Sequence, residues 1–305
     1  MKELTYYLVD VFTDTKYGGN QLAVFIDYEN LASDNDMLQI ARELGFAEIT
    51  FIKKNHDNQK FDVRIFTPEY EVPFAGHPSL GTAYVISKYL IPSPKGNLTL
   101  SLRHADIDIA LSNTQDIESC LFTMTQASPE FIADFSHKEI SEKLDIDLSL
   151  INTSLPIQEI TTGLPYIIIP IKNIESINKM ELEAKRTINF LIEEKKHKSN
   201  SSTGLSTSFF FFTEETVDKE NDYHTRMLLI ENGVYIEDAA TGSANGCFLA
   251  YLLKNVDPTI SVTTEQGFQM DRPSYLKLNG NINNGNYTIK VGGQVVSVGS
   301  GKWYI

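Results

Sequence analysis

Alternating apolar and polar positions predict that much of the chain folds as β-strands. Residues 6–12 (Tyr-Tyr-Leu-Val-Asp-Val-Phe) alternate, and Gly18-Gly19 separates them from a second apolar run at 21–26, which predicts a hairpin. Residues 34–44 instead carry their apolar side chains at helical spacing. Strand patterns then return at 49–52, 61–66 and 98–122.

The pattern changes near residue 125, where we place a boundary between two domains. Residues 126–150 are rich in acids and contain no glycine. Runs at 166–171 and 209–212 predict buried strands, and the charged segment 181–202 predicts a solvated helix with a Lys/Ser-rich loop. We therefore expect an N-terminal domain, 1–125, and a C-terminal domain, 126–305, whose last strand can pack back on the first domain.

Composition and charge bound the class of protein. A chain of 305 residues with 42% apolar content can supply cores for two domains of about 150 residues each. The formal net charge of −14 argues against nucleic acid and anionic membranes as partners, because both repel an acidic protein. No uncharged stretch of about 18 residues occurs, so we expect a soluble, cytoplasmic protein.

The cysteines and histidines give no signal for a metal site or a disulfide. Cys120 and Cys247 lie far apart without CxxC spacing, and we interpret Cys247 as a small core residue. The six histidines form no HxH or HExxH pair, so we expect no metal.

A short sequence pattern occurs twice, about 165 positions apart. The copies are residues 64–77 and 226–243, and each runs from an arginine through a glutamate to a glycine that introduces an apolar helical run. The matching residues are Arg64, Glu71, Gly76 and His77 in the first copy, and Arg226, Glu237, Gly242 and Ser243 in the second. This repeat predicts two half-sites that face one shared substrate.

A glycine at the start of an apolar helix brings unpaired backbone N–H groups and the positive helix end to one point. Gly76 and Gly242 both meet this description. Two such turns would hold a carboxylate or stabilise an enolate. The alternative for each glycine is a plain turn.

Glu48 is a charge within an apolar stretch at a helix-to-strand junction. Desolvation there would raise its pKa, as a general base working near neutral pH requires. The alternative is a helix-end glutamate with access to solvent. Residues 205–209 form a rough counterpart in the second half, with hydroxyls in place of the acid, so the site would carry one strong base.

Three further residues lie at the turns. Asp238 precedes Gly242 by four positions and would orient a substrate amine or hydroxyl, or shuttle a proton. His77 stands at a helix start, where the dipole disfavours its positive form, so it would act as a neutral donor or relay, or simply be satisfied by backbone. Ser243 lacks a GxSxG elbow, which favours a hydrogen-bond donor over a nucleophile.

Together these segments resemble the PhzF-like family of phenazine-biosynthesis isomerases, which share the diaminopimelate epimerase fold. The resemblance covers nearly the whole chain. The matching segments are residues 9–13 with 19–24, 64–68 with 74–78, 237–244, 265–267 with 272–274, and 291–293. The resemblance implies an α+β fold of two similar domains related by a pseudo-two-fold axis, each a β-sheet or barrel wrapped around a central helix, with the site in the interdomain cleft.

The same resemblance implies a cofactor-independent isomerase that moves a proton on a small carboxylate-bearing substrate. Glu48 matches the family's general acid/base, and the residues matching His77, Asp238 and Ser243 surround the substrate. We assign Gly76, Gly242, Asn20 and Thr241 to substrate binding. A homodimer is implied by the family alone. Gln21, Ala239 and Asp271 depart from the family pattern without removing a proposed catalytic group.

Two alternatives stay open. The first is an epimerase or racemase of an amino or hydroxy acid, with Asp238 as the base opposing Glu48. A two-thiol epimerase is disfavoured, because His77 and Ser243 stand where epimerases of this fold carry cysteines. The second alternative is a non-catalytic protein that binds a small anion or a protein partner.

Overall fold

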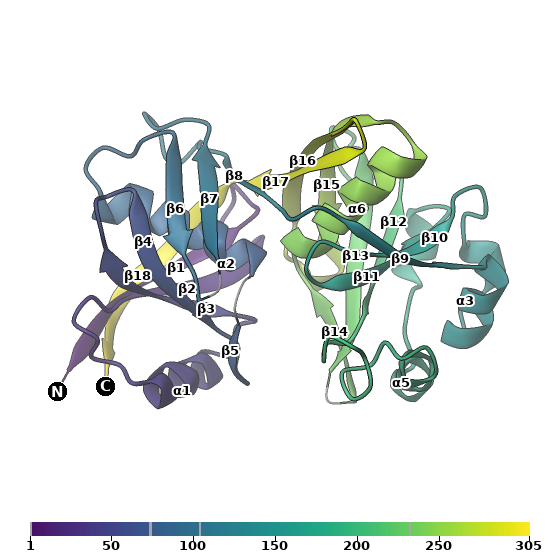
Figure 1. Ribbon diagram of the computed structural model, residues 1–305, viewed down its shortest axis with the longest axis horizontal. Coiled ribbons are helices and arrows are strands. Elements are labelled where there is room, and N and C mark those ends of the chain that lie inside the picture. The colour runs from purple at the N-terminus through teal and green to yellow at the C-terminus, as the bar shows by residue number, and fades with distance from the viewer. Residues whose placement is uncertain (1, 73–74, 104, 232) are drawn as a thin grey trace. The chain divides into compact units, whose positions relative to one another are not determined.

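The computed structural model describes residues 2–72, 75–103, 105–231 and 233–305 (Figure 1). The chain divides into two compact units. Unit 1 comprises residues 1–125 together with 292–305, and unit 2 comprises residues 126–291.

Unit 1 is built from a repeated strand plan that the C-terminal strand completes. Its strands are β1 (Glu3–Val11), β2 (Asn20–Ile26), β3 (Ile49–Asn55), β4 (Lys60–Phe66), β5 (Glu71–Val72), β6 (Asn97–Ser101), β7 (Asp106–Leu111), β8 (Phe122–Thr125) and β18 (Val295–Tyr304). β1 pairs antiparallel with β2, which confirms the hairpin, and β2 runs parallel to β3. β3 and β5 flank β4 antiparallel, β4 runs parallel to β6, and β7 follows antiparallel. β18 pairs with β1 from Glu3↔Tyr304 to Val11↔Val295.

Unit 2 follows the same plan. Its strands are β9 (Glu130–Phe135), β10 (Ile157–Thr161), β11 (Pro165–Pro170), β12 (Ser208–Thr213), β13 (Tyr223–Glu231), β14 (Val234–Asp238), β15 (Thr259–Gln266), β16 (Ser274–Asn283) and β17 (Asn286–Gly293). β10 to β14 pair in the order and directions of β1 to β5, and β13 runs parallel to β15 as β4 does to β6. β9 pairs with β10 as β18 pairs with β1. The repeat predicted around the two glycine turns therefore extends through the strand order of both units.

A buried helix lies among the strands of each unit (Figure 1). α2 (Gly76–Val85) buries all ten of its residues, and α6 (Gly242–Asn255) buries 11 of 14. Small and apolar residues cover every face of both helices, and α6 carries its only charged residue, Lys254, in the last turn. A helix without a polar face is stable only when it is enclosed. This arrangement confirms the expected α+β fold of sheets wrapped around central helices.

The outer faces of the sheets carry amphipathic helices. α1 (Asp34–Leu44) begins at a Ser33 capping box and ends at Gly45, whose φ of 65° is left-handed. It covers the apolar face that β2 and β3 share. In unit 2, α3 (His137–Leu144) and α5 (Ala184–Glu193) cover the corresponding face. The short helix α4 (Ile174–Asn178) and the single turns η1 (Ile86–Leu90), η2 (Leu148–Leu150) and η3 (Phe268–Met270) complete the connections.

The four-phenylalanine run of β12 is packed on both faces. Phe209 and Phe211 belong to the core beneath α3 and α5. Phe210 and Phe212 point the other way, with ring centroids 5.4 and 4.6 Å from that of Phe248 on α6. Because strand side chains alternate between faces, a continuous apolar run indicates a strand that is buried on both sides. The buried strand predicted at 209–212 is confirmed.

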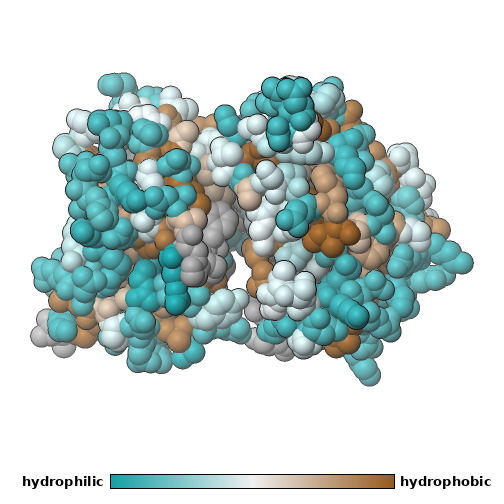
Figure 2. Space-filling view, viewed as in Figure 1, coloured by the Kyte–Doolittle hydropathy of each residue, from teal (hydrophilic) through white to brown (hydrophobic). Residues whose placement is uncertain are grey.

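Polar side chains cover most of the face that Figure 2 shows, in line with the net charge of −14. Among the described residues, no helix is long and apolar enough to cross a membrane.

Replacing Gly81 with alanine should destabilise unit 1 by about 2 kcal/mol, because overpacking a closed core forces neighbouring atoms apart. A Cβ at Gly81 would lie 2.5 Å from Leu22 Cδ2 and 2.8 Å from Val11 Cγ2. Urea unfolding followed by Trp303 fluorescence measures the effect in this unit, since Trp303 lies on β18 and is the single tryptophan. Gly96→Ala is the matched control, because its Cβ would meet no atom within 4 Å. Equal midpoints for the two variants would contradict close packing of α2 against β1 and β2.

Candidate active site

A bidentate ion pair holds the strand that leads into each glycine turn. In unit 1, Arg64 donates through Nε and Nη2 to the two carboxylate oxygens of Glu71, at 2.8 and 2.7 Å. In unit 2, Arg226 makes the same two contacts with Glu237, at 2.9 and 2.7 Å. Both glutamates lie on the short strand, β5 or β14, that precedes the helix. A guanidinium that makes two parallel hydrogen bonds to one carboxylate has a fixed direction as well as a fixed distance. Each pair therefore sets the orientation of the strand that enters its glycine turn.

The remaining guanidinium nitrogen differs between the two units. Arg64 Nη1 donates to the Asp34 carboxylate, 2.6 Å away, at the start of α1. Arg226 Nη1 donates instead to the backbone carbonyls of Ile177 and Met180, at 2.8 and 3.0 Å. Arg226 is only 6% exposed. These contacts tie Arg64 to the segment between β2 and β3, and Arg226 to the corresponding segment between β11 and β12.

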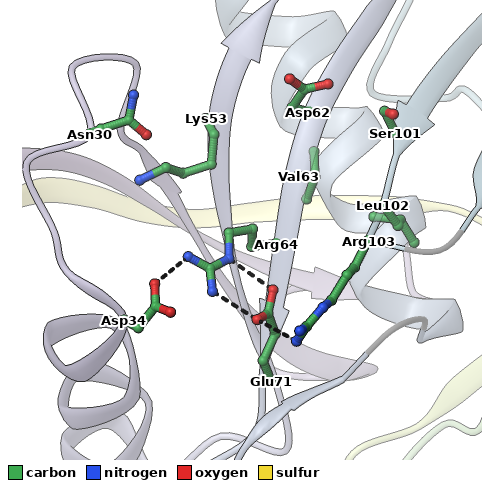
Figure 3. Close-up of a pocket in the computed structure, with 10 residues that line it drawn as sticks. All are labelled: Asn30, Asp34, Lys53, Asp62, Val63, Arg64, Glu71, Ser101, Leu102 and Arg103. Atoms are coloured by element: carbon green, nitrogen blue, oxygen red, sulfur yellow. Dashed lines mark hydrogen bonds and ion pairs between the residues drawn. The ribbon is translucent and has the colours of Figure 1, made fainter.

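An open hollow of about 560 Å³ lies beside Arg64 in unit 1 (Figure 3). Its charged lining residues pair among themselves or with neighbours: Arg103 also reaches Glu71, at 3.3 Å, and Lys53 binds Asp27, at 2.5 Å. None of the site residues predicted from the sequence lines this hollow.

The first glycine turn opens α2 without a side-chain cap in the described structure. The N-cap is Ala75, in extended conformation (φ −151°, ψ 144°). Ser79 Oγ donates back to the Ala75 carbonyl, at 2.8 Å, so this hydroxyl does not cover the first-turn N–H groups. Gly76 is buried at the helix start. Neither the Ala75 nor the Ser79 side chain therefore caps the start of this helix.

Glu48 and His77 come together at this turn. Glu48 directly precedes β3, and its Oε2 lies 3.7 Å from His77 Nδ1, too long for a direct hydrogen bond. The Glu48 side chain is 21% exposed and the His77 side chain 7%. Asn20, the first residue of β2, is 6% exposed.

Burial lowers the pKa of His77 to about 3, and a hydrogen bond with the Gln21 backbone opposes this shift only in part. The imidazole is therefore neutral near pH 7, and its contact with Glu48 is not an ion pair. The neutral state agrees with the sequence expectation, although burial rather than the helix dipole is the main cause. Within the described structure, the buried Nε2 atom has no hydrogen-bond partner.

The second glycine turn opens α6, again without a side-chain cap on the N-cap residue, Thr241. Thr241 Oγ1 donates to Asp238 Oδ2, at 2.5 Å. Ser243 Oγ lies 2.7 Å from the Tyr166 hydroxyl on β11. The Gly242 carbonyl accepts from Gln126 Nε2, at 2.8 Å. The structure thus joins Asp238 with Thr241 and gives Ser243 a phenolic partner.

Strand register identifies the counterpart of Glu48 in unit 2. Arg64 is opposite Phe51 in the β3/β4 pair, and Arg226 is opposite Phe211 in the β12/β13 pair. Counting back three residues from each phenylalanine reaches Glu48 and Ser208. The positions of Glu48 and His77 in unit 1 therefore correspond to two serines in unit 2, Ser208 and Ser243.

Sequence reasoning missed three side chains that hold the second turn. Tyr166 partners Ser243, and Gln266 and Asn245 lie beneath Thr241 with no exposed surface. Gln266 belongs to a family-like motif, but no local pattern shows what its amide binds. By contrast, the interpretation of Cys247 as a core residue is confirmed: it is buried, and burial raises the pKa of its thiol to about 12. No group of three or more His, Cys, Asp or Glu side chains in the described part of the chain could hold a metal ion.

The comparisons with known proteins agree with this architecture. The profile of the PhzC-PhzF family, described as phenazine biosynthesis-like protein, matches residues 9–301. An uncharacterized isomerase of Mesorhizobium japonicum is 29% identical over 314 residues, 100% of each chain. The trans-2,3-dihydro-3-hydroxyanthranilate isomerase of Pseudomonas aeruginosa is 27% identical over 271 residues, 88% of this chain and 87% of that one.

Among solved structures, a PhzF-family phenazine biosynthesis protein of Bacillus anthracis superimposes with a TM-score of 0.85 at 24% identity, covering 100% of both chains. At 24% identity the structural similarity shows the fold alone. The family match over residues 9–301 shows the family. The resemblance seen in the sequence is thereby confirmed: the chain belongs to the PhzC-PhzF family of phenazine biosynthesis-like proteins, and it is an isomerase.

Proposed function

We propose that the protein is a cofactor-independent isomerase in which Glu48 moves a proton on a small carboxylate-bearing substrate. The observation that carries this proposal is the half-buried Glu48 carboxylate, 3.7 Å from a neutral, buried His77 at an uncapped helix start. A carboxylate at this place can accept a proton from carbon. The substrate carboxylate or a conjugated double bond would supply the activation of that carbon.

Backbone N–H groups at the two glycine turns stabilise the negative charge that develops as the proton leaves. Preorganised donors at a helix start need no rearrangement during the reaction, which is the main advantage of such sites. The equivalence of Gly76 and Gly242 in the two units supports one substrate held by both turns. Asp238 and Ser243 would then orient the substrate while Glu48 transfers the proton.

The substrate class is a small amino or hydroxy acid. One relative is named as an isomerase of trans-2,3-dihydro-3-hydroxyanthranilate, a compound that carries a carboxylate, an amine and a hydroxyl. The donors at the turns and the acceptor at Asp238 suit a molecule with these three groups. Gln21 and Ala239 differ from the residues usual in the family and would alter the rim of the site. We therefore propose the same class of substrate for this protein, and not the same compound.

Glu48→Gln should abolish proton exchange at carbon, with a loss of at least about 100-fold, because the amide cannot accept the proton. The measurement is mass-detected deuterium uptake from heavy water, over a panel of cyclic and acyclic amino and hydroxy acids. Glu43→Gln is the matched control, since Glu43 is an exposed glutamate on α1 of the same unit.

Full uptake in Glu48→Gln would show that another group is the base. Uptake with migration of a double bond identifies an isomerisation, whereas uptake at a stereocentre without migration identifies an epimerisation. A ligand that binds tightly without any exchange in the wild-type protein would point to a binding function.

Neutral His77 should also make unit 1 sensitive to acid. Its folded pKa of about 3 lies below the ordinary value of 6.5, so below pH 6.5 the unfolded chain takes up a proton that the folded chain refuses. Stability is therefore lost as pH falls from 6.5 towards 3. At pH 5 the loss from this one group amounts to about 2 kcal/mol.

Urea unfolding followed by Trp303 fluorescence at pH 7 and pH 5 tests this expectation. His77→Gln should lose less stability between the two pH values than the wild-type protein does. His56→Gln is the control, because its ring is 35% exposed beside Asp62. Identical pH dependence in the wild-type protein and His77→Gln would mean that His77 is protonated, or free to be protonated, in the folded state.

A further inference from the structure

The buried side-chain amide of Gln266 makes hydrogen bonds to the second glycine turn. Gln266 ends β15 and has no exposed surface. Its Nε2 donates to the Asp238 carbonyl, at 2.8 Å, and to Thr241 Oγ1, at 3.0 Å. Its Oε1 accepts from the Thr241 backbone N–H, at 3.3 Å, and from Asn245 Nδ2, at 3.1 Å. One side chain thus contacts both ends of the turn.

The orientation of this amide is determined by its backbone partners. A carbonyl oxygen only accepts and a backbone N–H only donates, so the Asp238 carbonyl and the Thr241 N–H fix which end of Gln266 is nitrogen. Asn245 is fixed in the same way, because its Nδ2 donates to the Thr241 carbonyl, at 3.0 Å. Its Oδ1 then accepts from the hydroxyl of Thr264, at 2.6 Å.

These orientations determine where the Thr241 hydroxyl sends its single proton. The oxygen already accepts from Gln266 Nε2, which has no lone pair to receive a proton in return. The hydroxyl proton therefore goes to Asp238 Oδ2, 2.5 Å away. The chain of donors runs in one direction, from Gln266 through Thr241 to the carboxylate of Asp238.

We infer that Gln266 is a positioning residue that, through Thr241, presents Asp238 to the substrate as a hydrogen-bond acceptor. The substrate group that meets Asp238 is consequently a donor, an amine or a hydroxyl, and Asp238 is not the acid that returns a proton to carbon. This inference rests on the proposed function for the presence of a substrate, but the direction of the donor chain does not depend on it.

The first unit shows that the fold does not require this chain. Asp62 is opposite Ser101 in the β4/β6 pair and His224 is opposite Glu265 in the β13/β15 pair, which makes Leu102 the counterpart of Gln266. In the same alignment of the two units, Val72 corresponds to Asp238 and Ala75 corresponds to Thr241. Unit 1 builds its glycine turn with three apolar residues at these positions. The polar chain of unit 2 therefore serves its own half-site rather than the turn as such.

The titration of the Asp238 carboxyl group tests the inference without any substrate. Aspartate labelled with ¹³C at Cγ reports the titration, and Asp238→Asn identifies the signal. Thr241→Val removes the donor to the carboxylate, and Gln266→Met frees the hydroxyl to turn away. In both variants the titration midpoint should move to higher pH by about 1 unit, because a carboxylate that loses a hydrogen bond is less stable relative to its acid.

Thr187→Val is the matched control. Thr187 is a buried threonine of α5 in the same unit, and its hydroxyl has no partner among the described residues. This variant should leave the Asp238 midpoint where it is in the wild-type protein. An unchanged midpoint in Thr241→Val would overturn the donor chain, and a change in Thr241→Val without one in Gln266→Met would remove Gln266 from it. If Gln266→Met fails to fold, Thr241→Val still decides the direction of the proton.

Turnover provides the second readout. If Gln266 acts through Thr241, the fold-losses of Gln266→Met and Thr241→Val should not multiply in the double variant, since both remove one connected unit. If the double variant loses turnover by the product of the two single losses, Gln266 does not act through Thr241. Because the titration needs no substrate, an error in the assignment of Glu48 and an error in the assignment of Gln266 give different results.

Discussion

The paired arginine and glutamate are the constraint on which both glycine turns depend. Each pair joins β4 or β13 to the short strand that enters the glycine turn, β5 or β14. In unit 2 the pair is nearly buried, with side-chain exposures of 7% and 11%. Removing one member of such a pair leaves a buried charge without its partner, which typically costs about 3–5 kcal/mol. The helix start can present its N–H groups in a fixed direction because the strand before it cannot rotate.

On this shared frame the two units differ in chemistry. The first turn carries the Glu48 carboxylate and a neutral imidazole, whereas the second carries the Asp238 carboxylate and hydroxyls supported by buried amides. Duplication of one strand plan followed by loss of symmetry explains how the two turns can carry different side chains at corresponding positions. At the second turn both polar atoms of the Gln266 side chain have defined partners.

The local elements could be predicted from the sequence because their signals are local. α1 has the predicted bounds because Ser33 and Gly45 cap it at both ends. The glycine turns were visible because each repeats an arginine, a glutamate and a glycine in order. Gln266 and Tyr166 could not be predicted, since their partners lie 25 and 77 positions away and depend on strand register. Asp271 illustrates a middle case: its φ of 54° explains why glycine is common there, although the residue alone does not reveal the conformation.

The pairing of β18 with β1 gives the chain a particular order of assembly. Residues 295–304 complete the sheet that residues 3–11 begin, so unit 1 cannot be closed until a strand on the far side of unit 2 in the sequence has been made. Until residues 295–304 have been synthesised, one side of β1 lacks its native partner and offers unpaired backbone groups to other chains. Contacts between such distant segments also slow folding, because a long loop must close before they form. Unit 2 instead closes with its own first strand, β9, so all of its segments lie within residues 126–291 and precede β18.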